Sequence, residues 1–140
     1  MPMNPSEEKY DLVIVKDLVK YFPIRAGVLQ RVKAHVQAVD KVSFSVKEGE
    51  TLGMVGESGC GKTTVGRAIL RLIEPTSGSV FINGEDIVQM RSQSLKQARR
   101  NMQMIFQDPY ASLNPRLPIG ESVMEGLHIH SIGHPRERWD

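Results

Sequence analysis

The chain has 140 residues, 40% of them hydrophobic and 24% charged, with a formal net charge of +2. This length fits one globular domain, the composition excludes global disorder, and the small net charge gives no support for nucleic-acid binding. A single cysteine excludes an intrachain disulfide, and no apolar run reaches the length of a membrane span, so we expect no direct insertion into a membrane.

The first 35 residues predict one strand and a loop. Residues 1–10 form a polar lead-in, and the β-branched run at 12–15 predicts a strand. We expect this strand to end at residues 20–23, where two aromatic side chains precede a proline. Residues 24–35 are mixed and basic, which is typical of a loop or a loose hairpin.

A change of apolar periodicity marks the centre of the chain. Apolar and serine residues alternate over 42–46, which predicts a half-buried strand, and a turn follows at 48–50. The apolar run at 51–55 predicts a buried strand that leads into a tight turn. A helix follows, with a stop at 75–78, and its apolar face consists of Val65, Ala68, Ile69 and Leu72.

Short elements and breaks make up the remainder. Residues 80–88 predict a hairpin around an Asn-Gly turn, and the polar, basic residues 92–101 favour a helix. The apolar residues 102–106 predict another strand. Three X-Pro pairs between residues 108 and 118 predict a loop, and a helix is expected from Gly120 onwards.

Residues 56–64 carry the pattern G-x-x-x-x-G-K-[ST] between a predicted strand and a predicted helix, which is the context of a phosphate-binding loop. Glycines let backbone N–H groups converge on an anion, and the helix N-terminus adds partial positive charge. Lys62 is suited to reach the β- and γ-phosphates, and the Thr63 hydroxyl suits Mg²⁺. The sequence therefore predicts an ATP site formed by Gly56, Glu57, Ser58, Gly59, Cys60, Gly61, Lys62, Thr63 and Thr64.

Three other features have plain explanations. Cys60 fits either as a small loop residue or as a partly activated thiol at a helix N-terminus. The histidines at 128, 130 and 134 do not predict a metal site, because the first two point apart on a helix and no cysteine is near. A solvated helix face, rather than a nucleic-acid site, explains the basic residues Arg91, Lys96, Arg99 and Arg100.

The chain resembles the ATP-binding subunits of ABC transporters, in particular the oligopeptide and dipeptide importer branch. The resemblance covers the chain from about residue 11 and is carried by residues 38–44 with 49–64, by 75–80, and by 105–116. The phosphate loop alone is generic to many nucleotide-binding proteins. The importer branch is favoured by the last stretch, which reads Ile105-Phe106-Gln107-Asp108-Pro109 followed by Tyr110-Ala111-Ser112-Leu113-Asn114-Pro115-Arg116.

The resemblance implies roles for further residues. Gln107 matches the Q-loop glutamine, which binds Mg²⁺ and links the nucleotide to a helical subdomain, so Lys62 and Gln107 are the implied catalytic residues and Thr63 and Gln107 the implied Mg²⁺ ligands. Phe22 matches the aromatic that stacks on adenine, with Tyr21 as the alternative. Residues 110–116 resemble the face that meets membrane-spanning subunits.

The implied fold is α/β: a P-loop NTPase core of the ABC ATPase type with an antiparallel β subdomain. Residues 11–108 would form the nucleotide-binding core, and residues 109–140 the start of the helical subdomain. The implied function is ATP hydrolysis coupled to import of peptides or similar solutes. Implied partners are transmembrane permease subunits and a second, identical or different, ATPase subunit, at the cytoplasmic face of the cell membrane.

Hydrolysis in this family also uses an S-G-G-Q-type signature, an Asp-Glu pair (Walker B) and a switch histidine, and none of these follows Gln107 in the sequence. We therefore expect a fragment, truncated within the helical subdomain, that binds nucleotide but shows no appreciable ATPase activity alone. The alternatives are another P-loop NTPase, such as a kinase or GTPase, and a non-catalytic nucleotide sensor or an ABC protein that serves repair or translation.

Overall fold

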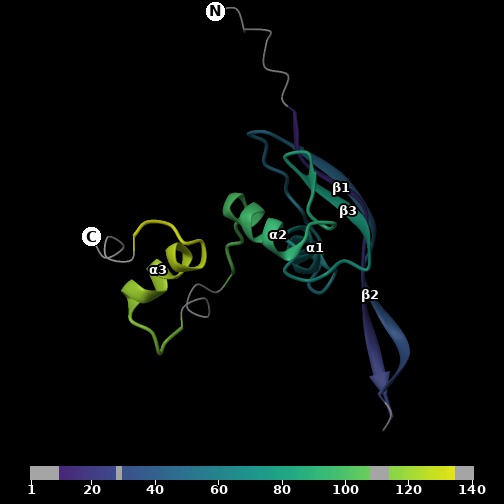
Figure 1. Ribbon diagram of the computed structural model, residues 1–140. Coiled ribbons are helices and arrows are strands. Elements are labelled where there is room, and N and C mark those ends of the chain that lie inside the picture. The colour runs from purple at the N-terminus through teal and green to yellow at the C-terminus, as the bar shows by residue number, and fades with distance from the viewer. Residues whose placement is uncertain (1–9, 28–29, 108–113, 135–140) are drawn as a thin grey trace, which may run out of the picture. The chain divides into compact units, whose positions relative to one another are not determined.

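The computed structural model describes residues 10–27, 30–107 and 114–134. They divide into two compact units, Met1–Met90 and Arg91–Asp140 (Figure 1). The boundaries predicted at residues 10 and 108 stay a prediction.

An antiparallel sheet forms the frame of the first unit (Figure 1). Its order is β2-β1-β3-β4, with every neighbouring pair antiparallel. The strands are β1 (Asp11–Ala26), β2 (Arg31–Lys47), β3 (Ser77–Ile82) and β4 (Glu85–Asp86). The predicted strands at 12–15 and 42–46 and the predicted hairpin at 80–88 are confirmed, and its Asn-Gly turn has positive φ at both residues, as a tight hairpin requires.

The core of this unit lies between the sheet and the helix α1 (Lys62–Ile69). Val65 and Ala68 are the buried residues of α1, which confirms that part of the predicted apolar face. The buried apolar side chains of the unit are Val15, Leu18, Val19, Val39, Val65, Ala68, Val80 and Ile87. Because β1 is central and pairs with both β2 and β3, it supplies three of these residues.

The helix α1 ends earlier than the sequence predicts. Leu70 is its C-cap, and Arg71 takes a left-handed conformation with φ 50°. The N–H groups of Arg71 and Leu72 donate to the carbonyls of Ala68 and Arg67, at 3.0 and 2.8 Å. This pair of bonds is a Schellman motif, which terminates helices. Leu72 therefore lies beyond the helix and is exposed.

The prediction that residues 20–23 end the first strand is wrong, because β1 continues to Ala26. Pairing of β1 with β3 stops at Val19, so the distal part of β1 has only β2 as a neighbour. Pro23 lies opposite His35 in this stretch. A proline is tolerated there because its missing N–H faces the side without a strand. The loose hairpin predicted at 24–35 is confirmed in its hairpin form.

The second unit contains α2 (Ser92–Ala98), the short 3₁₀ helix η1 (Arg99–Asn101) and α3 (Ile119–Ile129). The helices expected at 92–101 and from residue 120 are confirmed. Leu95 and Met124 are their buried side chains. None of the helices in the described part of the chain combines the length and apolar character that crossing a membrane requires.

Two predicted strands are wrong. Residues 51–55 and 102–106 are not assigned to strands, and in the described residues neither has a hydrogen-bonded strand partner. Val55 is 92% exposed and Ile105 is 90% exposed. A strand exists only where a neighbour satisfies its backbone groups, so an apolar run alone does not produce one.

Candidate nucleotide-binding site

The predicted phosphate loop lies directly before α1, with Gly61 as the N-cap residue. The first turn of α1 contains no acidic side chain, and no side chain caps it. The carbonyl of Gly61 accepts a hydrogen bond from the Val65 N–H at 2.9 Å, which is the first hydrogen bond of the helix. The amides of Lys62, Thr63 and Thr64 precede that bond and have no partner inside the helix. They and the helix dipole make this end attractive to an anion.

Gly61 occupies a position that has no room for a side chain. Its φ is 97°, and a Cβ added to it would lie 2.2 Å from the backbone oxygen of Ala38 on β2. The loop is therefore closely packed against the sheet at the residue before the lysine. Closer to the start of the loop, a Cβ on Gly56 would lie 2.6 Å from the Cys60 sulfur. The Gly61 contact is with backbone and explains why that position of the motif is glycine, whereas the Gly56 contact is with a side-chain sulfur.

The Lys62 side chain folds back over the loop. Its Nζ donates to the carbonyl oxygens of Gly56 and Glu57, at 2.6 Å each, and lies 3.4 Å from the Cys60 Sγ. A second bond, from the Cys60 N–H to the Glu57 oxygen at 3.3 Å, closes the turn. The ammonium group of the first residue of α1 thus bridges two carbonyls of the loop that precedes the helix.

The residues present fit a bound triphosphate with its metal. Amides of the helix start and one ammonium provide positive charge, and the glycines of the loop allow close approach. Thr63 is exposed in the first turn of α1, so its hydroxyl is accessible to a hard cation. Glu57, Ser58, Gly59 and Thr64 also lie in or directly after this loop.

Phe22 and Tyr21, the two candidates for the base platform, differ in their contacts. The Tyr21 hydroxyl donates to Asp40 Oδ1 at 2.7 Å, and its backbone N–H donates to Thr76 Oγ1 at 2.9 Å. The hydrogen bond to Asp40, followed by desolvation and the carboxylate charge, raises the pKa of Tyr21 above 10.0. Phe22 is 39% exposed. The structure therefore favours Phe22 as the aromatic available to a ligand.

Gln107 belongs to the second unit, and its side chain is exposed. Its predicted role as a Mg²⁺ ligand and catalytic residue stays a prediction. The predicted permease-contacting segment 110–116 lies mostly outside the described residues. Within its described part, Asn114 Oδ1 accepts from the Arg116 N–H at 3.0 Å, and the Asn114 carbonyl accepts from the Leu117 N–H at 3.1 Å.

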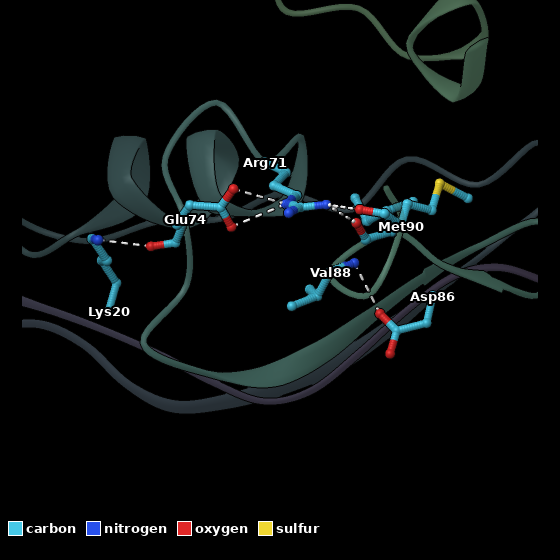
Figure 2. A network of polar contacts seen from close by, with 7 residues as sticks. Lys20, Arg71, Glu74, Asp86, Val88 and Met90 are labelled. Carbon is cyan, nitrogen blue, oxygen red and sulfur yellow. Dashed lines mark hydrogen bonds and ion pairs between the residues drawn. The ribbon is translucent and has the colours of Figure 1, made fainter. Parts of the chain in front are cut away.

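A polar network at the other end of α1 was not predicted (Figure 2). We call it the Arg71 network; it consists of Lys20, Arg71, Glu74, Ile87 and Met90. Arg71 Nε bonds both carboxylate oxygens of Glu74 at 3.0 Å, and its Nη1 donates to the carbonyls of Ile87 and Met90 at 3.1 and 2.6 Å. Lys20 Nζ donates to the Glu74 carbonyl at 2.7 Å. Arg71 and Glu74 have i,i+3 spacing, but no spacing pattern connects them to Lys20, Ile87 and Met90.

The comparisons with known proteins identify the family of the chain. Residues 39–139 match the ABC transporter family. The chain is 51% identical over 125 residues to the oligopeptide transport ATP-binding protein AppF of Bacillus subtilis, covering 89% of this chain and 38% of AppF. It is 52% identical over 123 residues to the glutathione import ATP-binding protein GsiA of Pectobacterium atrosepticum, covering 88% of this chain and 20% of GsiA.

A solved structure gives the same result for the fold. The ATP-binding cassette MJ0796, a dimer in a post-hydrolysis state with ADP and Pi, superposes with a TM-score of 0.70 at 28% sequence identity. The match covers 91% of this chain and 52% of that chain. The predicted ABC ATPase fold is therefore confirmed, while the chain spans about half or less of the length of these relatives. The chain belongs to the ABC transporter family.

Proposed function

We propose that this chain binds ATP with Mg²⁺ and is the nucleotide-binding part of an ATPase that drives import of peptides or similar solutes. One observation carries the proposal: the loop before α1 combines the amides of a helix start, an ammonium that bonds two loop carbonyls, and a glycine, Gly61, that admits no side chain. The names of the curated relatives, which are import ATP-binding proteins, support the choice of solute import.

Each site residue has a distinct task in this proposal. The amides at the start of α1 hold the phosphates, and Lys62 places its charge between the β- and γ-phosphates. Thr63 and Gln107 would hold a Mg²⁺ ion, which would supply positive charge at the phosphates. Phe22 stacks on the base. Phosphoryl transfer depends on positioning and charge, so the residues of this chain bind and orient rather than react covalently.

The partners follow from the same proposal. ATP-driven import needs transmembrane permease subunits, and residues 110–116 are the segment we assign to that contact. A second ATPase subunit completes the site, which is supported by the dimeric form of MJ0796. The protein then lies at the cytoplasmic face of the membrane. That the 140 residues alone release no phosphate from ATP stays a prediction, which a phosphate-release assay tests.

The direct test of nucleotide binding is the substitution Lys62→Ala. Loss of a charge-assisted contact, worth about 1.5–3 kcal/mol, lowers the affinity for a fluorescent ATP analogue about 10- to 100-fold. Lys47→Ala is the matched control, because Lys47 is an exposed lysine at the end of β2. Equal binding by Lys62→Ala and the parent protein would show that the loop does not hold the triphosphate.

A further inference from the structure

Lys20 connects Phe22, the residue proposed to stack on the base, to the segment that follows α1. Lys20 Nζ lies 4.9 Å from the centroid of the Phe22 ring, within range of a cation–π interaction. The same Nζ donates to the Glu74 carbonyl at 2.7 Å. A single ammonium group therefore holds the ring and a backbone carbonyl at fixed distances from each other.

That carbonyl belongs to a segment that is itself fixed. The Glu74 carboxylate is held by Arg71 Nε at 3.0 Å, and Arg71 Nη1 holds the carbonyls of Ile87 and Met90 (Figure 2). The Arg71 side chain is only 17% exposed. Arg71 follows α1, whose first residue is Lys62. The contacts thus run from the phosphate loop, along α1 and the Arg71 network, to Lys20.

We propose that Lys20 is a positioning residue that sets the Phe22 ring at the distance from the phosphate loop that ATP requires. The proposal rests on the ATP binding proposed above. A nucleotide makes contact at two ends, base and phosphates, and both contacts form together only if the two protein groups have the correct spacing. Lys20 acts through Phe22, and it does not itself touch the phosphates.

The contacts of Tyr21 support Phe22 as the residue on which Lys20 acts. Tyr21 is fastened to Asp40 through its hydroxyl and to Thr76 through its backbone N–H. The Lys20 ammonium lies over the Phe22 ring, whereas the Tyr21 hydroxyl bonds to Asp40. The ring of Phe22 is partly exposed, and Lys20 restrains it without burying it.

The chain contains a matched control for this lysine. Lys16, four positions earlier on β1, has its Nζ 5.4 Å from the centroid of the Phe81 ring on β3. The two lysines therefore make the same kind of contact from the same strand. Only the contact of Lys20 involves Phe22 and a carbonyl beyond the end of α1.

The experiment compares two ligands, Mg-ATP and magnesium tripolyphosphate, by calorimetric titration of the purified protein. Tripolyphosphate has no base and reports on the phosphate loop alone. In Lys20→Met we expect ATP affinity to fall about 3- to 10-fold, because the variant loses part of the free energy of base stacking. The affinity for tripolyphosphate should be unchanged. Lys20→Arg should retain most of the ATP affinity because it keeps the cation, and Lys16→Met should change neither affinity.

A double substitution tests whether Lys20 acts through the ring. In a Phe22→Leu background, Lys20→Met should cause no further loss of ATP affinity, because the platform is already removed. A loss of the same size in both backgrounds would overturn the proposal. So would an equal loss for ATP and tripolyphosphate in Lys20→Met, since that marks a general structural effect, and so would an unchanged ATP affinity.

The substitution Lys62→Ala separates this inference from the proposed function. If Lys62→Ala weakens both ligands while Lys20→Met leaves their ratio unchanged, ATP binding stands and the role of Lys20 is wrong. If Lys62→Ala changes neither affinity, the proposed ATP site itself is wrong. Thermal unfolding of each variant shows whether it is folded at the titration temperature. If Lys20→Met is unfolded there, the comparison is made with Lys20→Arg.

Discussion

The two ends of α1 are fixed by different means. At the N-terminal end the backbone conformation fixes the helix. Gly61 is left-handed and lies against the Ala38 carbonyl, and the first amides of α1 have no partner inside the helix. At the C-terminal end a side chain fixes the helix: Arg71 also takes a left-handed conformation, and its guanidinium bonds the Glu74 carboxylate and the carbonyls of Ile87 and Met90. Both ends of α1 therefore require a left-handed residue. Glycine occupies the position where there is no room for a side chain, and arginine occupies the position where a side chain can form hydrogen bonds.

The largest expected loss of stability comes from a substitution at the N-terminal end of α1. Gly61→Ala forces a Cβ against the Ala38 carbonyl and a left-handed conformation on alanine, so we expect unfolding free energy to fall by at least about 2 kcal/mol. ATP binding should be lost with it. Chemical denaturation measures the change, and Gly66→Ala is the control.

Gly66 lies inside α1, and an added Cβ meets nothing within 4 Å. Alanine is the better helix former there, so the control substitution should raise stability by about 0.5–1 kcal/mol. If both substitutions changed stability equally, the close approach at Gly61 would have no energetic importance.

A second prediction sharpens the comparison at the C-terminal end. Arg71→Ala removes the side-chain bonds and keeps a strained backbone, whereas Arg71→Gly removes the bonds and relieves the strain. We expect Arg71→Ala to cost about 2 kcal/mol and Arg71→Gly to be the more stable of the two variants by about 0.5–1 kcal/mol. Denaturant unfolding of both variants gives the order. Greater stability of the alanine variant would mean that residue 71 is not left-handed in solution.

The smallest expected effect concerns Tyr21, which lies next to the segment that follows α1. Its hydrogen bond to Asp40 stabilises the protonated phenol, so its pKa is raised in the folded protein. The stability from this bond is complete below about pH 10 and is lost as the pH rises through the raised pKa.

Ultraviolet absorbance of tyrosinate measures this titration. Asp40→Asn should lower the midpoint of Tyr21 towards the usual value, because it removes the acceptor charge. Tyr21→Phe should remove one titrating group and leave the others unchanged. An unchanged midpoint in Asp40→Asn would show that the phenol does not bond to Asp40.

How far the sequence predicted the structure depended on the range of the interactions. The phosphate loop and the apolar face of α1 were predicted because their patterns are local and set by spacing. The strands expected at 51–55 and 102–106 were not found, because pairing is decided by a neighbour elsewhere in the chain. Pro23 was misjudged for a similar reason: whether a proline breaks a strand depends on which side has a partner.

The candidate site divides in the same way. The position of Lys62 at the start of a helix could be predicted from the motif, whereas the hydrogen bond that distinguishes Tyr21 from Phe22 could not, and the role of Phe22 stays a prediction. Apart from the ion pair between Arg71 and Glu74, the Arg71 network joins residues up to 54 positions apart through backbone carbonyls that any residue type carries. Such contacts leave no trace in residue identity, which is why Arg71 and Lys20 were missed.

The two carbonyl contacts of Lys62 have a consequence for the speed of ligand capture. The ammonium joins two carbonyls of the loop and thereby holds the loop through contacts within the chain itself. A side-chain rotation takes picoseconds to nanoseconds, whereas ordering of a loose segment takes far longer. Ligand entry therefore exchanges one set of oxygen partners for another, and the association rate should be set by diffusion and orientation rather than by a slow rearrangement of the protein.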